Sequence, residues 1–415
     1  MPETIDKNTF LGLFSPGQRV YVGGSTNEPT GLINILKSHP ERISGITFIQ
    51  QPLVVNETDL SSLADDCRQV TFFMTPALRE GYASGRVDFI PMQMRAIHDY
   101  LARDKIDIAL LQAARDINGI LRFGPNVDYV GAVSDSASCM VIQINSSFIA
   151  PLGSPKVNLD NQCLLIEVDS AKPLYPETRV DETSRQIGNL VAGIVRDGNC
   201  LQTGIGAAPS AILAALGNRS DLGFHGGLVD DGVMQLVKNG NLTGIRKSID
   251  TGKHVAGMAL GSAALLDWAA EDGNFVLRSA DYTHELSVIQ QLDNFISINS
   301  AVEIDLFGQV NAEVTAGRQV SGTGGAVDFM RAAKLSRNGR SVVAMSATAR
   351  RGQVSRIVPR VEMVTALRTD VDMVVTEFGI ARLKDASLAE RAELLIEIAH
   401  PDFRDQLREA ASPGN

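Results

Sequence analysis

The sequence is poor in the features that mark secreted, membrane-spanning or disulfide-stabilised proteins. It has 4 cysteines in 415 residues and no CxxC pair, so we expect reduced, mostly buried thiols in a cytoplasmic protein. No run reaches the roughly 18 apolar residues that a membrane helix needs, so no membrane association is expected. The first residues, MPETIDKNTF, have neither the basic nor the apolar region of a secretion signal.

The charge balance, the spacing of the histidines and the glycine pattern argue against three further classes of protein. There are 38 basic and 48 acidic residues and a net charge of −10, which argues against a nucleic-acid-binding protein but permits a local basic pocket. The histidines show neither HxH nor HExxH spacing, so no metal is expected. No GxGxxG turn follows the first predicted strand, and no acidic residue lies at the ribose-binding spacing, so no nicotinamide cofactor is expected.

Short apolar runs rich in β-branched residues alternate along the chain with longer amphipathic stretches. Predicted strands at residues 17–24, 43–50 and 106–114 belong to a first series, and a similar series follows the proline-containing segment 174–182. This alternation predicts an α/β fold with mainly parallel sheets. We therefore predict two α/β domains, residues 1–182 and 183–415. Their similar alternation makes a duplicated architecture plausible, although no sequence repeat is visible.

Two glycine-rich turns in the second half each precede a predicted helix. The first consists of Gly204, Ile205, Gly206, Ala207 and Ala208, and the second ends with Gly324 and Gly325. Glycines bring backbone N–H groups close to a ligand, and a following helix N-terminus favours a phosphate or an oxyanion. The alternative for each turn is a plain connection between strand and helix with no ligand.

A basic segment and a histidine-containing turn are two further candidates. Residues 346–356 combine small hydroxyl residues with three arginines, among them Arg351. Arginine forks suit phosphate groups, and a solvated basic loop is the alternative. In the turn at residues 222–232, His225 is either catalytic or, as a lone histidine more often is, structural.

Several long blocks in a fixed order carry a resemblance over nearly the whole chain. They lie at residues 81–94, 106–129, 204–216, 298–313, 321–333, 346–359 and 374–383. Together they resemble the acetyl-CoA hydrolase/transferase family, which includes 4-hydroxybutyrate CoA-transferases. The resemblance implies two α/β domains of the CoA-transferase type, an active site in the cleft between them, and a homodimer or higher homo-oligomer.

The same resemblance implies a small-molecule acyl-CoA as the substrate. Coenzyme A would be bound by Gly204, Ile205, Gly206, Ala207, Ala208, Val302, Gly324, Gly325 and Arg351. The backbone amides of Ile205 and Gly325 would form an oxyanion hole, which stabilises the negative charge that grows on a thioester oxygen during attack.

The family's transferases use a glutamate nucleophile, and that glutamate is absent here. It lies in a His-x-Glu-Met block before Asp-Gly, and the matching position in this sequence is Gly227. Glycine offers no nucleophile for covalent catalysis, so ping-pong CoA transfer by the usual route is not expected. His225, Glu303 and Glu313 are the candidate catalytic side chains that remain.

Three functions stay open at this point. The first is acyl-CoA processing, by hydrolysis rather than by glutamate-dependent transfer, because removal of the carboxylate leaves room for a water molecule. The second is hydrolysis or lysis of a carbon–carbon bond in a cyclic or β-keto acyl-CoA. The third is a non-catalytic protein that binds coenzyme A, because fold alone does not fix function.

Overall fold

The chain forms two compact units in a computed structural model that describes residues 3–159, 163–176 and 178–411. The first unit combines Met1–Pro176 with Leu228–Asp231 and Val255–Thr283, and the second combines Glu177–Gly227, Gly232–His254 and His284–Asn415. Short stretches of the second half therefore belong to the first unit. The predicted boundary between residues 182 and 183 stays a prediction. Among the described residues, no helix is long and apolar enough to cross a membrane.

The first unit contains a sheet with the strand order β1-β9-β8-β6-β2-β3-β4-β5, and β7 pairs with β6. All of these pairs are parallel except β6 with β7. The strands are β1 (Glu3–Thr4), β2 (Arg19–Val22), β3 (Thr47–Gln50), β4 (Arg68–Thr71), β5 (Val87–Phe89), β6 (Ile106–Arg115), β7 (Leu121–Phe123), β8 (Ala137–Ile144) and β9 (Cys163–Glu167).

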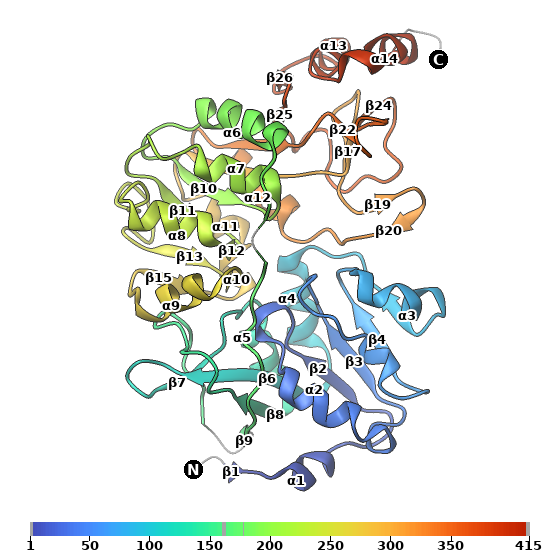
Figure 1. Cartoon of the computed structure of the whole chain (residues 1–415), viewed down its shortest axis with the longest axis vertical. Helices are drawn as coiled ribbons and strands as arrows, with labels where there is room; N and C mark the ends of the chain where they lie inside the picture. The colour runs from blue at the N-terminus through green and yellow to red at the C-terminus, as the bar shows by residue number, and fades with distance from the viewer. Residues whose placement is uncertain (1–2, 160–162, 177, 412–415) are drawn as a thin grey trace. The chain divides into compact units, whose positions relative to one another are not determined.

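Helices and short 3-10 turns connect these strands. They are α1 (Lys7–Leu11), η1 (Ser25–Asn27), α2 (Thr30–Lys37), η2 (Pro40–Arg42), η3 (Leu60–Ser62), η4 (Pro76–Leu78), α3 (Arg79–Ala83), α4 (Met94–Arg103) and α5 (Val130–Ser136). The apolar face of α2 packs against β2 and β3, as Figure 1 shows, because Leu32 and Leu36 share a buried core with Val20 and Phe48.

The segments of the second half that belong to the first unit add short elements. They are β12 (Leu228–Val229), β14 (Met258–Ala259), α9 (Ala263–Glu271), β15 (Phe275–Leu277) and α10 (Ala280–Thr283), with β13 (His254–Ala256) starting at the edge of the segment. Strands β12 and β14 pair in parallel.

The second unit has its own parallel sheet, in which the strands run in the order β11-β10-β16-β21-β25-β26. Every pair in this run is parallel except β25 with β26. The strands are β10 (Cys200–Thr203), β11 (Gly223–His225), β16 (Phe295–Asn299), β21 (Arg340–Ala344), β25 (Met373–Thr376) and β26 (Gly379–Arg382). Except for β26, they are almost continuously buried, as the apolar runs of the sequence predict.

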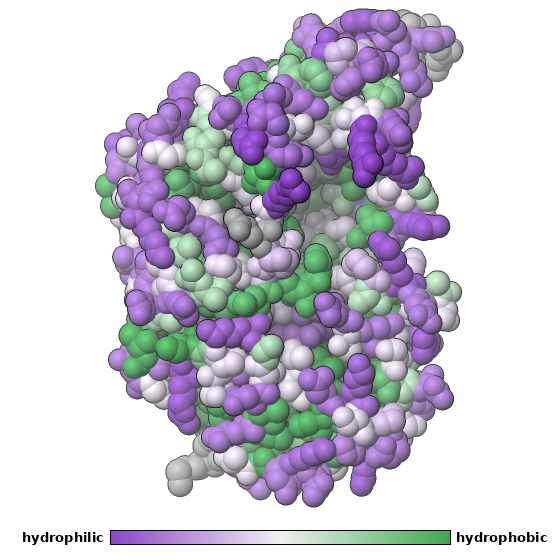
Figure 2. All heavy atoms as spheres, viewed as in Figure 1, coloured by the Kyte–Doolittle hydropathy of each residue, from purple (hydrophilic) through white to green (hydrophobic). Residues whose placement is uncertain are grey.

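The remaining elements of the second unit are helices and small antiparallel or mixed sheets. The helices are α6 (Glu182–Ile194), α7 (Ala207–Ala214), α8 (Asp231–Lys238), α11 (Leu286–Ile289), α12 (Ala326–Leu335), α13 (Leu388–Glu397), η5 (Pro401–Phe403) and α14 (Arg404–Ala411). The short strands are β17 (Glu303–Asp305), β18 (Val310–Asn311), β19 (Val314–Thr315), β20 (Arg318–Gln319), β22 (Thr348–Ala349), β23 (Val354–Ser355) and β24 (Ile357–Val358). Helix α13 starts with a reciprocal capping box between Ser387 and Glu390. On the face that Figure 2 shows, the C-terminal helices are mostly hydrophilic.

The two units share one feature that positions ligand sites. In the first unit the chain runs from β2 outward through β3, β4 and β5, then returns to β6 on the other side of β2. In the second unit β11 lies on one side of β10, and β16 lies on the other. The strand order therefore reverses between β2 and β6 and between β10 and β16. Open α/β sheets bind ligands at the carboxyl ends of the strands at such a switch point.

Candidate functional site

The glycine turn at residues 204–208 lies at the switch point of the second unit. The Gly204 amide donates to the Ile298 carbonyl oxygen at 3.1 Å, which ties the end of β10 to β16. Gly206 has φ 118° and ψ −179° and precedes α7, and this conformation favours glycine. Among the described residues, the amides of Ile205 and Gly206 have no hydrogen-bond partner. Both N–H groups therefore remain available to a ligand.

A buried network of polar side chains supports this turn from below. The Ser297 hydroxyl donates to Gln202 Oε1 at 2.8 Å, and Asn299 Nδ2 donates to the same oxygen at 3.0 Å. The amide Nε2 of Gln202 donates to Asn299 Oδ1 at 3.2 Å. These residues were not predicted as part of the site, although polar residues at the ends of otherwise apolar strands were a usable signal. Fully satisfied buried networks hold their surroundings rigidly.

Two of the predicted glycines meet at one buried histidine. A Cβ atom on Gly227 would lie 3.2 Å from His284 Nε2 and 3.4 Å from His284 Cε1. A Cβ atom on Gly325 would lie 2.5 Å from His284 Cδ2 and closer still to Nε2. The imidazole therefore fills the space that a side chain at either position would enter. Residue 325 must be glycine for this packing, and residue 227 borders the same ring.

Burial keeps the His284 ring uncharged. Its side chain is fully buried, and desolvation, followed by the charge on nearby His225, lowers the pKa of His284 to about 3. The ring packs on Phe329 with centroids 4.6 Å apart. At neutral pH, His284 is thus a neutral imidazole at the start of α12, whose first residue follows Gly325.

The contacts connect the separate glycine turns into one region. A Cβ atom on Gly226 would lie 3.4 Å from Gln202 Cγ, and one on Gly204 would lie 3.6 Å from Asn299 Oδ1. Since Gln202 and Asn299 bond each other, the turns after β10, β11 and β16 surround one polar network. Gly227 follows Gly226 in the chain and borders the His284 ring. The same ring borders Gly325. The structure therefore brings together residues that lie up to about 120 positions apart in the sequence.

The candidate glutamates have structural partners in the described residues. Glu303 Oε1 accepts from Asn311 Nδ2 at 3.0 Å and from the Glu362 amide at 3.1 Å. Glu313 Oε1 accepts from the hydroxyl of Thr323, two residues before Gly325. These bonds order the loop that leads to α12. A catalytic role for either carboxylate stays a prediction.

The other predicted ligands of coenzyme A lie in two different settings. The Val302 amide donates to the Asn311 carbonyl oxygen at 2.8 Å, and the Val302 carbonyl oxygen accepts from Arg356 Nε at 2.8 Å. Arg356 therefore braces the backbone after β16. Arg351 lies exposed at the tip of the β22–β23 hairpin, where Arg350 and Arg351 have φ 51° and 58°. Such positive φ values in two consecutive non-glycine residues are uncommon.

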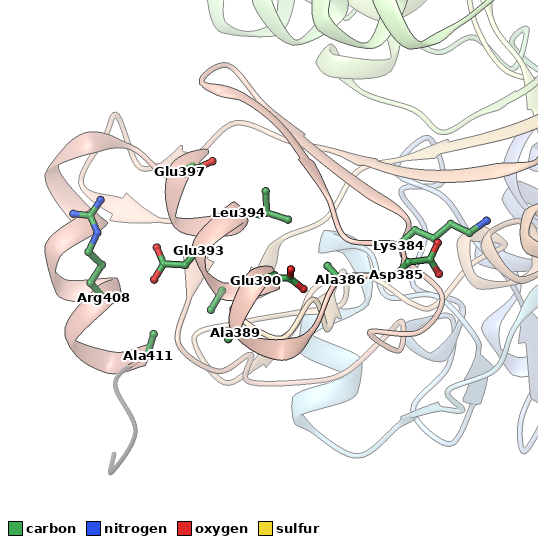
Figure 3. A pocket seen from close by; sticks show the side chains of 11 residues that line it. Lys384, Asp385, Ala386, Ala389, Glu390, Glu393, Leu394, Glu397, Arg408 and Ala411 are labelled. Carbon is green, nitrogen blue, oxygen red and sulfur yellow. The ribbon is translucent and has the colours of Figure 1, made fainter.

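A hollow near the C-terminus is unrelated to these turns. It measures about 820 Å³ and lies between α13, α14 and the residues after β26. Figure 3 shows the acidic side chains of Glu390, Glu393 and Glu397 and the basic Arg408 among those that line it. No predicted site residue is among the described residues that line this hollow. The pKa of Glu390, which takes part in the capping box of α13, is lowered by its hydrogen bonds with Ser387.

The mainly parallel sheets with glycine turns at their switch points are those of the CoA-transferase class. A 4-hydroxybutyrate CoA-transferase structure from Porphyromonas gingivalis matches with a TM-score of 0.80 and 29% identity, over 97% of this chain and 95% of that chain. RipA from Yersinia pestis matches with a TM-score of 0.88 and 29% identity, over 98% of this chain and 99% of that chain. These likenesses confirm the predicted α/β fold.

The chain belongs to the acetyl-CoA hydrolase/transferase family of enzymes. The family's N-terminal domain model matches residues 3–170, and its C-terminal domain model matches residues 261–411. The 4-hydroxybutyrate coenzyme A transferase of Clostridium kluyveri is 33% identical over 94% of this chain and 92% of its own length. A protein named acetyl-CoA hydrolase, from Candida albicans, is 30% identical over 59% of this chain and 48% of its own length. The family thus includes both transferases and hydrolases.

Proposed function

We propose that this protein hydrolyses acyl-CoA thioesters and does not transfer coenzyme A through a covalent glutamyl intermediate. The single observation that supports this choice is Gly227, which has no side chain and lies against the neutral imidazole of His284. A covalent route needs a nucleophile at this point. Water attack on the thioester forms a C–O bond, breaks the C–S bond and passes one proton of the water, through solvent, to the leaving sulfur of coenzyme A. It therefore needs no protein nucleophile, and the protein stabilises the charge that develops on the carbonyl oxygen.

The proposed site uses the bare amides of the second unit. The amides of Ile205 and Gly325 have no partner among the described residues, and in this proposal they donate to the thioester oxygen as negative charge grows on it. Residues 204–208, Val302 and Gly324 contact the pantetheine thioester. Arg351 pairs with a phosphate of coenzyme A, because its exposed guanidinium has no ion-pair partner among the described residues.

The role of His284 in this proposal follows from its burial. A ring with a pKa near 3 is a weak base at neutral pH, so it is a poor general base. It acts instead as a positioning residue that holds the backbones of Gly227 and Gly325 at a fixed separation. A pre-organised donor needs such support, since small displacements of catalytic groups cost rate.

The direct test is an acyl-CoA panel with and without small carboxylates. We expect release of free coenzyme A from at least one thioester without any acceptor, and no acceleration or acyl exchange when acetate is added. Mass spectrometry of the products distinguishes this result from carbon–carbon bond cleavage, which would shorten or open the acyl group. Transfer of coenzyme A to acetate at a rate above hydrolysis would refute the proposal.

The Gly227→Glu variant places a carboxylate at the position that matches the glutamate of the transferases. A Cβ atom there would lie 3.2 Å from His284 Nε2, so the His284 ring must shift by a few tenths of an ångström to admit that atom. We expect this variant to transfer coenzyme A to acetate at least about tenfold faster than the wild type. Gly217→Glu is the matched control, because Gly217 is exposed and a Cβ atom there meets nothing within 4 Å. Equal transfer by both variants would contradict the assignment of position 227.

A further inference from the structure

A basic hollow of the second unit lies at the edge of its sheet opposite the glycine turn of residues 204–208. Strands β10, β16, β21 and β25 are parallel, so all four start at this edge and end at the other. Strands β16 and β21 have five residues each, a length of roughly 15 Å. The hollow measures about 580 Å³. It is therefore separated from the proposed thioester site by the length of the strands.

Three arginines from separate segments line this hollow. Arg196 lies four residues before β10, Arg340 is the first residue of β21, and Arg382 is the last residue of β26. Because β26 is antiparallel to β25, its last residue pairs with Met373, the first residue of β25. The strand order and register thus bring all three arginines to one edge of the sheet.

The guanidinium groups have few partners of their own. Within the part of the chain that the structure describes, none of the three forms an ion pair, and the side chain of Arg196 has no hydrogen-bond partner. Arg340 Nη1 donates to the Ile194 carbonyl oxygen at 3.5 Å, and Arg382 Nη1 donates to the Met373 sulfur at 3.6 Å. Hydrogen bonds of this length are weak, and sulfur is a weak acceptor. Most of the N–H donors therefore remain available to a ligand.

The positive charges lie close enough to act on one another. Arg340 is partly buried. Its pKa is lowered first by burial and then by the charges of Arg196 and Arg382, and the charge of Asp372 raises it in part. Like charges that are held together and partly desolvated destabilise the charged form of each group. An anion in the hollow would remove this repulsion.

The charge of the hollow matches one phosphate group. Four cationic side chains, the three arginines and Lys384, line it together with the carboxylates of Asp197 and Asp372, which leaves a net charge of +2. Both carboxylates already accept from backbone amides, Asp197 from Ser220 and Asp372 from Ser341, each at 2.9 Å. A phosphate monoester carries a charge of about −2 at neutral pH, so one such group would neutralise the hollow.

The surroundings restrict the ligand to a small molecule. Lys384 also lines the neighbouring hollow beside α13, where Glu390, Glu393 and Glu397 carry negative charge. The basic surface therefore does not continue past Lys384 as the long stripe that a nucleic acid needs. A volume of about 580 Å³ falls in the range of small-molecule sites.

We propose that this hollow binds the phosphate group of a small molecule, with Arg196, Arg340 and Arg382 as the side chains that contact it. Each planar guanidinium group can donate two N–H groups to two phosphate oxygens. The ligand is a dianionic phosphate, either free or as a monoester. The inference does not rest on the proposed function, because the hollow and the glycine turns lie at opposite edges of the sheet.

Calorimetric titration of the full chain tests the site with inorganic phosphate, ribose 5-phosphate and ribose. We expect both phosphates to bind once per chain with a Kd below about 1 mM at low salt, and ribose not to bind. The Kd should rise at least about fivefold when NaCl is raised from about 0.05 M to about 0.5 M, because salt screens the charges. Tighter binding of ribose 5-phosphate than of phosphate identifies a phosphorylated small molecule as the ligand, and equal Kd values identify the free anion.

Three variants and one control assign the binding to the hollow. Arg196→Gln and Arg382→Gln replace exposed arginines, so both should fold, and each should raise the Kd of ribose 5-phosphate by about tenfold or more. Arg340→Lys keeps the charge but loses the planar fork, so it should raise the Kd by about three- to tenfold. Arg68→Gln removes the same charge from β4 of the first unit, where the side chain is 52% exposed, and should leave the Kd within about twofold.

Several results would overturn the assignment. They are a Kd above about 1 mM for both phosphates, equal binding of ribose and ribose 5-phosphate, and binding that all three variants retain. Loss of binding in Arg351→Ala, with no change in the three variants, would place the phosphate in the proposed coenzyme A region instead. Titration involves no turnover, so a failure of acyl-CoA hydrolysis would refute the proposed function and leave the phosphate site standing.

Discussion

Replacement of Gly325 by alanine tests whether the His284 ring fixes the proposed site. The new Cβ atom would lie 2.5 Å from His284 Cδ2, closer still to Nε2, and 3.2 Å from Phe329 Cε2. Van der Waals contacts between carbon atoms begin at about 3.5 Å. The His284 ring must therefore move by roughly 1 Å within a buried cluster. Over-packing of this kind costs about 1–3 kcal/mol. Gly227→Ala, with 3.2 Å available, should be nearly neutral, because the lost flexibility of the unfolded chain offsets a small strain.

The assay is calorimetric unfolding of four proteins: wild type, Gly325→Ala, His284→Ala and the double variant. We expect Gly325→Ala to lower the Tm of the second unit by about 2–8 °C. In the His284→Ala background, Gly325→Ala should reduce the free energy of unfolding by at least about 1 kcal/mol less than it does in the wild type. The reason is that the ring that the new Cβ atom would contact is absent. If the two effects add within about 0.4 kcal/mol, the imidazole does not occupy the space beside Gly325 and the reasoning fails.

Two further predictions follow from the electrostatics of the second unit. The pKa of His284 is about 3 in the folded chain, against an ordinary 6.5, so the unfolded chain binds a proton that the folded chain does not as the pH falls below 6.5. The free energy of unfolding should therefore fall by up to about 2 kcal/mol between pH 6.5 and pH 5. This fall should disappear in His284→Gln. Identical pH dependence of the free energy of unfolding in the wild type and in His284→Gln would contradict the lowered pKa of His284. Arg351→Ala should raise the KM for an acyl-CoA by about three- to tenfold at low salt, less at high salt, with kcat unchanged. Arg185→Ala, in the exposed first turn of α6, is its control, and equal effects of both substitutions would remove Arg351 from the site.

Much of the fold was predictable because it depends on local patterns. The apolar run at residues 106–114 became β6 (Ile106–Arg115), and the run at 43–50 contains β3 (Thr47–Gln50). The glycine turn at 321–325 precedes α12, as its composition indicates, whereas α7 starts at Ala207 and so includes the last two residues of the predicted turn at 204–208. Strand periodicity, turn chemistry and helix starts are properties of a few adjacent residues. The similar alternation in the two halves corresponds to two sheets whose strand order reverses beside β2 and beside β10.

The candidate site was predictable only in part. Its glycines were named from the sequence, and the absence of a side chain at Gly227 needs no structure. The network of Gln202, Ser297 and Asn299 was missed because its members come from β10 and β16, 95 and 97 positions apart.

The sequence by itself determined which elements form, which family they belong to, and that no carboxylate stands at position 227. Only the tertiary structure decided what lies beside Gly227. The packing of the second unit inserts the ring of His284 between Gly227 and Gly325 and removes its charge by burial. Contacts and desolvation depend on residues distant in the chain, and these are fixed only when the strands take their order in the sheet.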